Sequence, residues 1–132
     1  MSDQCSCGCT PVKVKMVFAC SGASDVGGVT DQAARKLSRE KTASMSCIAA
    51  VAAEIPDIMK KVQAADQIIA LDGCDHECAA AILRKGGIDT FAHVRLKELG
   101  LEKGKTPVTE ETIAKAACAA AEALERQAER MA

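Results

Sequence analysis

The sequence predicts an α/β domain in which helices cover both faces of a four-stranded parallel sheet. Short apolar segments alternate with amphipathic helical segments along 132 residues, a length that suits one domain. Aromatic residues make up only 2% of the chain, so small aliphatic side chains must form the core. With right-handed crossovers, this alternation predicts a three-layer Rossmann-like sandwich with strand order 2-1-3-4 and four helices.

The first half of the domain is expected to contain two strands and two helices. Residues 12–20, VKVKMVFAC, alternate and then become fully apolar, which predicts a strand entering the core. A Gly/Ser turn follows, where Ser24 or Asp25 can cap the next helix. The segment MSCIAAV, from Met45, predicts a second buried strand, and Pro56 suits the first turn of the helix after it.

The second half repeats the alternation. Residues 67–71, QIIAL, predict the third strand, and the next helix is expected over about 75–85, before a Gly-Gly stop. Residues 91–96, FAHVRL, alternate and predict the fourth strand. The last helix is expected over about 109–130, because two glutamates in its first turn are favoured by the helix dipole.

Charge and hydropathy exclude several classes of partner. The formal net charge of -1 gives no basic excess for nucleic acid phosphates, and few aromatic residues are present to stack bases. We find no polybasic or amphipathic membrane anchor, and no apolar run of the ~20 residues that a spanning helix needs. The apolar run MVFAC is too short for a secretory signal, so the sequence predicts a cytoplasmic protein with reduced thiols. It does not indicate a protein partner.

Several of the eight cysteines are expected at one edge of the sheet. Cys20 ends the first strand and Cys74 follows the third, where strand order reverses and ligands bind in such sheets. Cys78 comes one helical turn after Cys74, at a helix N-terminus that favours thiolates. Cys47, in the second strand, is either a fourth ligand or a small buried apolar residue, and Cys118 is expected in the core. Four thiolates around one centre form a tetrahedral zinc site, so zinc is the expected metal partner and cofactor.

Three motifs resemble the DGC domain family, which is named for its Asp-Gly-Cys motif. They are CSGASDVG at 20–27, SCIAAVA at 46–52 and LDGCDHECA at 71–79. The resemblance covers about residues 12–97 and implies zinc binding through four cysteines, which are Cys20, Cys47, Cys74 and Cys78. In the second motif, AAVAA stands where the family has a glycine-rich stretch, so the shape of that loop is expected to differ. The family has no assigned biological role, so the resemblance implies a metal site and not its purpose.

Other polar and thiol groups could contribute to the site. The CSCGC motif lies in residues 1–11, a predicted flexible tail before the single domain over 12–132, and its thiols either chelate soft metals or play no part. His76 either replaces a thiolate or is exposed in the first helical turn, which is the expectation. His93 is expected to be structural, and Asp72 to accept hydrogen bonds from the turn or to support the ligands.

The loop after the first strand does not match the common nucleotide or phosphatase motifs. A Cys-x5-Arg phosphatase loop from Cys20 would need arginine where the chain has Val26, and no Walker A or G-x-G-x-x-G sequence follows the strand. The sequence therefore favours a metal-binding protein, structural or metal-handling, over an enzyme. One alternative is a thiol redox enzyme or redox sensor that uses Cys74 and Cys78, or Cys20. Another is a small-ligand or interaction module in which zinc only stabilises the fold.

Overall fold

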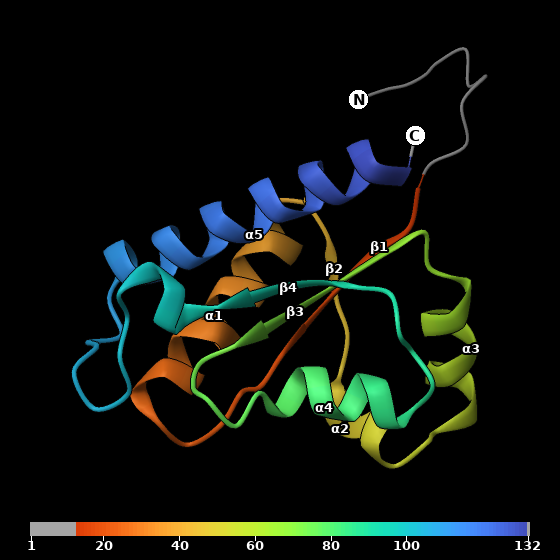
Figure 1. Cartoon of the computed structure of the whole chain (residues 1–132), viewed down its shortest axis with the longest axis horizontal. Coiled ribbons are helices and arrows are strands. Elements are labelled where there is room, and N and C mark those ends of the chain that lie inside the picture. The colour runs from red at the N-terminus through yellow and green to blue at the C-terminus, as the bar shows by residue number, and fades with distance from the viewer. Residues whose placement is uncertain (1–12, 132) are drawn as a thin grey trace.

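A computed structural model describes residues 13–131 of the chain and contains a four-stranded parallel sheet (Figure 1). The strand order β2-β1-β3-β4 confirms the predicted topology. The strands are β1 (Lys15–Ala19), β2 (Ser44–Met45), β3 (Gln67–Asp72) and β4 (Ala92–Arg95). The long central pair, β1 and β3, is hydrogen-bonded in register from Lys15 opposite Gln67 to Ala19 opposite Leu71.

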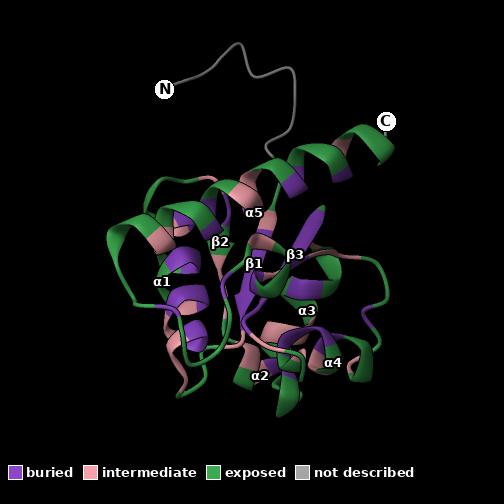
Figure 2. Ribbon diagram, turned by 60° about the vertical axis from the view of Figure 1, so that its left-hand side comes forward, coloured by how far each residue is buried: buried purple, intermediate pink, exposed green. Residues whose placement is uncertain are grey.

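Helices cover both faces of the sheet, as the predicted three-layer sandwich requires. Alternate side chains of β1 point to opposite faces, with Val17 in one core cluster and Phe18 in the other. The Val17 face packs against α1 (Asp25–Arg39) and α5 (Glu110–Met131). The Phe18 face is covered by α2, α3 and α4, whose bounds are Ile48–Ala52, Pro56–Ala64 and Cys78–Lys85. Figure 2 shows the buried residues concentrated on the strands and on the helix faces turned towards them.

The second predicted strand is much shorter than expected, and its loss creates a fifth α-helix in the described part of the chain. Strand β2 pairs with β1 only at Ser44 and Met45, and the segment from Ile48 is the short helix α2. A short apolar run does not distinguish a buried strand from a buried helix, and the three alanines of IAAVA favour the helix. Cys47 therefore lies at the N-cap of α2 and not in a strand.

The helix after β3 also begins later than predicted, at Cys78 instead of Asp75. Residues 73–77 form a turn that ends at Glu77, whose φ of 51° lies in the left-handed region. A residue with this backbone conformation cannot continue a right-handed helix, so the turn and the helix are separate. Cys74 consequently lies in the turn, while Cys78 is the first residue of α4.

The remaining helices and strands lie close to their predicted positions, although one residue that was predicted to be buried is exposed. The Ser24 hydroxyl accepts a hydrogen bond from the Gly27 amide, which confirms Ser24 as the N-cap of α1. Pro56 begins α3, and a short 3-10 helix, η2 (Leu96–Leu99), follows β4 directly. Cys118, predicted in the core, is instead exposed on α5. No helix of residues 13–131 is both long and apolar enough to cross a bilayer, and the predicted flexible tail at 1–11 lies outside the described residues.

Candidate functional site

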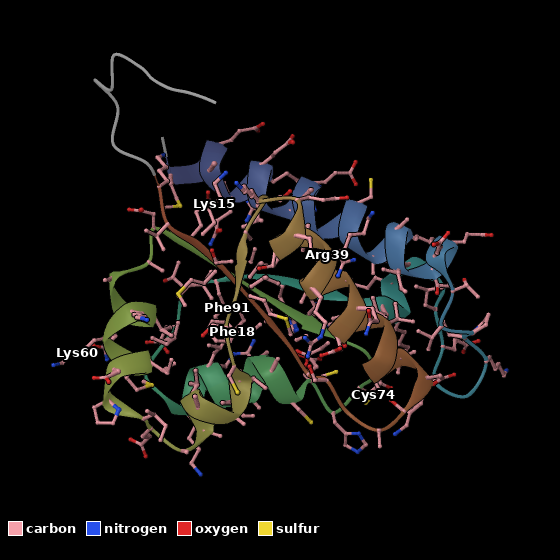
Figure 3. All side chains as sticks on the ribbon, turned by 180° about the vertical axis from the view of Figure 1, so that it is seen from behind. Lys15, Phe18, Arg39, Lys60, Cys74 and Phe91 are labelled. Carbon is pink, nitrogen blue, oxygen red and sulfur yellow. The ribbon has the colours of Figure 1, made fainter. Side chains whose placement is uncertain are left out.

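Three of the four predicted zinc ligands lie just after the carboxyl ends of strands, and the fourth, Cys78, begins α4. Cys20 comes directly after β1, Cys47 lies two residues after β2, and Cys74 lies two residues after β3. Figure 3 shows Cys74 at the far end of the sheet from Lys15, the first residue of β1. Because parallel strands end at the same edge, the fold brings these residues to one side of the molecule.

Two neighbouring cavities divide the cysteines into overlapping sets. Cys20, Cys74 and Cys78 line a cavity of about 460 Å³, and His76 lines it with them. Cys47 lines a second cavity, of about 790 Å³, and Cys20 is the cysteine common to both. Cys20 therefore borders both cavities, whereas Cys47 borders only the larger one and Cys74 and Cys78 border only the smaller one.

The thiol of Cys20 is held by the first turns of α1. Its amide donates to the Leu71 carbonyl at 3.1 Å, which extends the pairing of β1 with β3 by one residue. Its Sγ lies 3.2 Å from Oγ1 of Thr30, whose hydroxyl donates to the Gly27 carbonyl at 3.0 Å. Because a hydroxyl carries one proton, the Cys20 thiol is the donor to Thr30 in this arrangement.

Two glycines allow the loops that carry Cys20 and Cys74 to pack closely against α1. A Cβ at Gly27 would lie 2.6 Å from the carbonyl oxygen of Gly22, within the Cys20 loop. A Cβ at Gly73 would lie 2.8 Å from the backbone carbonyl carbon of Val26. Real Cβ atoms do not approach other atoms this closely, so the glycine of the Asp-Gly-Cys motif is required by space.

The aspartate of the same motif caps the helix that begins with Cys78. Asp72 is 1% exposed, and its carboxylate accepts hydrogen bonds from the amides of Ala79 at 2.8 Å and Ala80 at 3.1 Å. These amides belong to the first turn of α4, where the helix dipole favours a negative charge. Asp72 was predicted to accept hydrogen bonds from the turn, and this is wrong as to the donors, because they are amides of the helix α4.

A histidine and an arginine of β4 complete this network. His93 Nε2 lies 2.7 Å from the Asp72 carboxylate, a contact that is consistent with the structural role predicted for this histidine. Arg95 pairs through Nε with Glu77 at 3.1 Å, at the end of the turn. Both contacts fasten the Cys74 turn to the edge strand β4, so the turn is supported from α1, α4 and β4 together.

His76 is exposed, as expected, but it also contacts a cysteine. Its Nδ1 lies 3.3 Å from the Sγ of Cys74, and both residues line the smaller cavity. A thiol in contact with an imidazole is a common pairing at sites that use a cysteine. This contact keeps His76 open both as an alternative ligand and as a partner for a reactive cysteine.

The loop at 102–106, which contributes Lys103 to the lining of the smaller cavity, was not predicted from the sequence. The Asp25 carboxylate accepts hydrogen bonds from the amides of Gly104 and Thr106, each at 3.0 Å, which ties this distant loop to the start of α1. The amides of Gly104 and then Thr106 lower the pKa of Asp25 below its usual value, against a smaller opposing effect of burial. The loop thereby carries Lys103 to the wall of the cavity that Cys20, Cys74 and Cys78 line. Asp25 as a first-turn acid was visible in the sequence, but its partners about 80 residues away were not.

The donor atoms around the smaller cavity fit zinc in type, because zinc binds thiolates and imidazole. As the side chains stand, no group of three or more Cys, His, Asp or Glu residues within 13–131 is arranged to hold one metal ion. Two thiols have other partners, Cys20 with Thr30 and Cys74 with His76. The residues are therefore suitable as ligands, but they are not gathered into a coordination sphere.

Comparison with known proteins identifies the family. A model of the DGC domain matches residues 16–120. The chain belongs to the DGC domain family. This match confirms the resemblance found in the sequence, and it spans the four cysteines at 20, 47, 74 and 78 while leaving out the CSCGC motif at 5–9.

The DGC chain is also similar to a named bacterial protein. It is 36% identical over 88 residues to the anaerobic and virulence modulator AnvM of Pseudomonas aeruginosa, which covers 67% of each chain. No solved structure matches the chain.

Proposed function

We propose that this DGC-family protein binds zinc through cysteine thiolates at the carboxyl edge of its sheet and acts as a regulatory protein in the cytoplasm. The observation that carries the proposal is the single cavity lined by Cys20, Cys74 and Cys78. The similarity to a protein named as a modulator supports the regulatory part. An enzymatic role is not part of the proposal.

Two of the proposed ligands can be re-aimed by side-chain rotation. A cysteine has one side-chain torsion before its sulfur, so rotation of Cys20 away from Thr30 and of Cys74 away from His76 re-aims both thiols without moving the backbone. Cys78 is exposed at the start of α4, so its side chain is free to turn towards the cavity that it lines. The fourth ligand in the proposal is Cys47, with His76 as the alternative.

The lining of the smaller cavity carries both signs of charge, with Lys103 on one side and the carboxylates of Asp72 and Glu77 on the other. Several thiolates with one Zn²⁺ leave a net negative charge, because each thiolate carries one negative charge and the ion carries two positive charges. Lys103, held at the cavity wall by the Asp25 contacts, supplies a nearby positive charge. In the proposal, the loop at 102–106 places the charge of Lys103 at the cavity wall, a role that its sequence did not indicate.

Zinc affinity of single-cysteine variants tests the proposal. The full chain is purified with a reductant, its metal content is measured, and zinc is titrated in competition with a coloured chelator. Cys74→Ser should weaken zinc binding at least about tenfold and expose free thiols, because a ligand is lost. The matched control is Cys118→Ser, which changes an exposed cysteine on α5 and should bind zinc as the natural chain does. Equal zinc affinity in both variants would contradict the proposal.

A thiol redox function is the second candidate, and the contact between Cys74 and His76 favours it. The Nδ1 atom of His76 lies 3.3 Å from the Cys74 sulfur, and a base in contact with a thiol is a common arrangement at sites where a cysteine reacts. Two thiols, Cys74 and Cys78, would then give up two protons and two electrons to hydrogen peroxide, forming one disulfide and two water molecules. Mass spectrometry should show a loss of two hydrogens after peroxide and its reversal by dithiothreitol. The candidate is rejected if the chain binds zinc tightly and its thiols then resist peroxide.

A further inference from the structure

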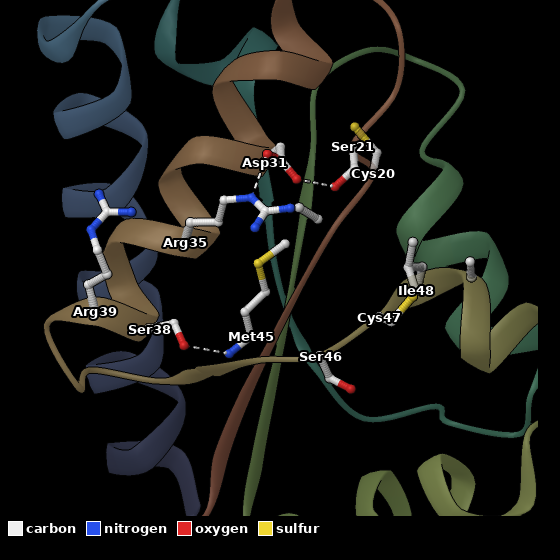
Figure 4. Close-up of a pocket in the computed structure, with 12 residues that line it drawn as sticks. Cys20, Ser21, Asp31, Arg35, Ser38, Arg39, Met45, Ser46, Cys47 and Ile48 are labelled. Carbon is white, nitrogen blue, oxygen red and sulfur yellow. Dashed lines mark hydrogen bonds and ion pairs between the residues drawn. The ribbon is translucent and has the colours of Figure 1, made fainter.

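The larger cavity at the edge of the sheet has the size and lining of a small-molecule site. It lies between α1 and the segment that joins β2 to α2, and its volume is about 790 Å³ (Figure 4). Ligand pockets in proteins usually measure about 300–1,000 Å³ and combine apolar walls with a few placed polar groups. The cavity exists because β2 is only two residues long, so the edge of the sheet beside α1 is left uncovered.

One arginine inside this cavity is oriented by two further side chains. The Nε of Arg35 pairs with one oxygen of Asp31 at 2.8 Å, and the Ser21 hydroxyl donates to the other oxygen at 2.9 Å. Figure 4 shows the Arg35 side chain reaching from α1 over Met45 towards Ser21 and Cys20. These contacts orient the Arg35 side chain, which is 55% exposed and forms part of the cavity wall, and they leave its terminal nitrogens directed away from α1.

The charges of this pair persist at neutral pH. Burial alone would raise the pKa of Asp31, but hydrogen bonds from Arg35 and Ser21 outweigh it and lower that pKa. The hydrogen bond that Arg35 donates to Asp31 also raises the pKa of Arg35. Within residues 13–131 no second carboxylate pairs with Arg35, so its two terminal nitrogens retain donors for an anion.

The remaining lining provides an excess of positive charge and an apolar wall. Arg39 lies one helical turn beyond Arg35 at the margin, so two guanidinium groups and one carboxylate line the cavity. The hydroxyl of Ser38 accepts from the Met45 amide at 3.2 Å and keeps its own proton free to donate. The half-buried side chains of Met45 and Ile48 form the apolar part.

We propose that this cavity binds a small organic carboxylate, whose anionic group pairs with the terminal nitrogens of Arg35 and whose apolar body packs on Met45 and Ile48. Planar guanidinium and carboxylate groups form two parallel hydrogen bonds. The apolar wall of Met45 and Ile48 favours an anion with an organic body over inorganic phosphate, which has none. The proposal does not rest on zinc binding, because the polar contacts to the ligand are made by Arg35 and Ser38, while Asp31 only orients Arg35. Since Cys20 and Cys47 also line the cavity, a bound carboxylate would lie beside the proposed metal ligands.

Titration with benzoate tests the site directly. Two-dimensional NMR of the full chain should show saturable shifts for amides at Arg35, Met45 and Ile48, and the uncharged analogue benzamide should not produce them. Arg35→Gln should weaken benzoate binding about tenfold or more, since it removes a charge-assisted hydrogen bond pair. The matched control Arg126→Gln changes an exposed arginine on α5 and should leave the affinity unchanged.

Further outcomes would overturn the proposal. It fails if benzoate does not bind, if benzamide or inorganic phosphate binds equally well, or if Arg35→Gln keeps the natural affinity while remaining folded by circular dichroism. The Cys74→Ser variant separates this result from the zinc experiment, because Cys74 does not line the larger cavity. That variant should bind benzoate normally whatever its zinc affinity, and a loss of benzoate binding there would contradict the proposal.

Discussion

The turns that follow β3 and β2 each carry a proposed zinc ligand, but they are supported very differently. The turn with Cys74 follows a buried central strand, packs through Gly73 against α1, and is fastened by Asp72 to α4 and β4. The turn with Cys47 follows a two-residue edge strand and begins a five-residue helix that has no side-chain cap. Cys47 is also exposed, whereas Cys74 is half-buried.

This difference indicates how a site at the sheet edge would be assembled. Cys20 and Cys74 are held by the central strand pair, which extends to the hydrogen bond between the Cys20 amide and Leu71. Cys47 depends on the hydrogen bond from the Ser46 amide to the Val17 carbonyl at 3.0 Å and on a helix that is short for independent stability. We therefore expect one rigid side with Cys20 and Cys74, and one adaptable side with Cys47.

The largest effect is expected when the close packing of the rigid turn is disturbed. Gly73→Ala places a Cβ 2.8 Å from the Val26 backbone, which cannot move aside without shifting α1. Overpacking of this kind should lower the free energy of unfolding by about 2–3 kcal/mol, measured by urea denaturation. Gly22→Ala is the control, because its Cβ would meet nothing within 4 Å. Equal stability of the two variants would mean that the Cys74 turn is not rigidly packed.

A slightly smaller loss is expected when the capping carboxylate is neutralised. Asp72→Asn keeps the size of the side chain but removes the charge that two amides of α4 and His93 face. The free energy of unfolding should fall by about 1–2 kcal/mol. Asp75→Asn serves as control, because Asp75 is exposed and pairs only with the exposed Lys97, a contact worth little. If Asp72→Asn unfolds at the same urea concentration as this control, the network does not stabilise the turn.

The comparison is sharpened by measuring zinc binding on both sides of the site. Cys47→Ser should weaken zinc binding less than Cys74→Ser does, so that the dissociation constants of the two variants differ by about tenfold. The reason is that His76 or water can replace the lost Cys47 ligand. Competition with a coloured chelator gives both constants under the same conditions. The reverse order would show that the edge strand, and not the central pair, holds the more important ligand.

The smallest effect is expected at Asp25, which fastens the loop with Lys103. Its pKa is lowered by the amides of Gly104 and Thr106, so the folded chain holds the ionised form more strongly than the unfolded chain does. The resulting stability is present above the unfolded value of 3.8 and is lost as the pH falls through the lower folded pKa. Between about pH 6 and about pH 3, Asp25→Asn should therefore lose less unfolding free energy than the natural chain. Asp89→Asn, which changes an exposed aspartate, should show the same dependence of unfolding free energy on pH as the natural chain. If the natural chain and both variants showed the same dependence, Asp25 would not be the group that titrates.

Local patterns were sufficient to predict most of the fold. The central strands at 15–19 and 67–72 and the long helices α1 and α5 carry strong apolar periodicity or clear caps, and each lies where the sequence indicates. The errors concern short segments. The run MSCIAAV contains no signal that distinguishes a strand from a helix. The first residue of α4 is set by hydrogen bonds that the Asp72 carboxylate accepts from the amides of Ala79 and Ala80.

By itself, the sequence determined the parallel topology, the place of Cys20 and Cys74 at the carboxyl edge, and the family. These follow from residue order, because alternating strands and helices with right-handed crossovers leave few possible arrangements. Only the tertiary structure decided that Cys47 lies outside a strand, that Cys118 is exposed, and that Asp25 holds the loop of Lys103. It also decided that Asp31 orients Arg35 within a cavity beside the cysteines. The physical reason is that each of these features depends on which distant segment packs against a residue, and a local pattern does not contain that information.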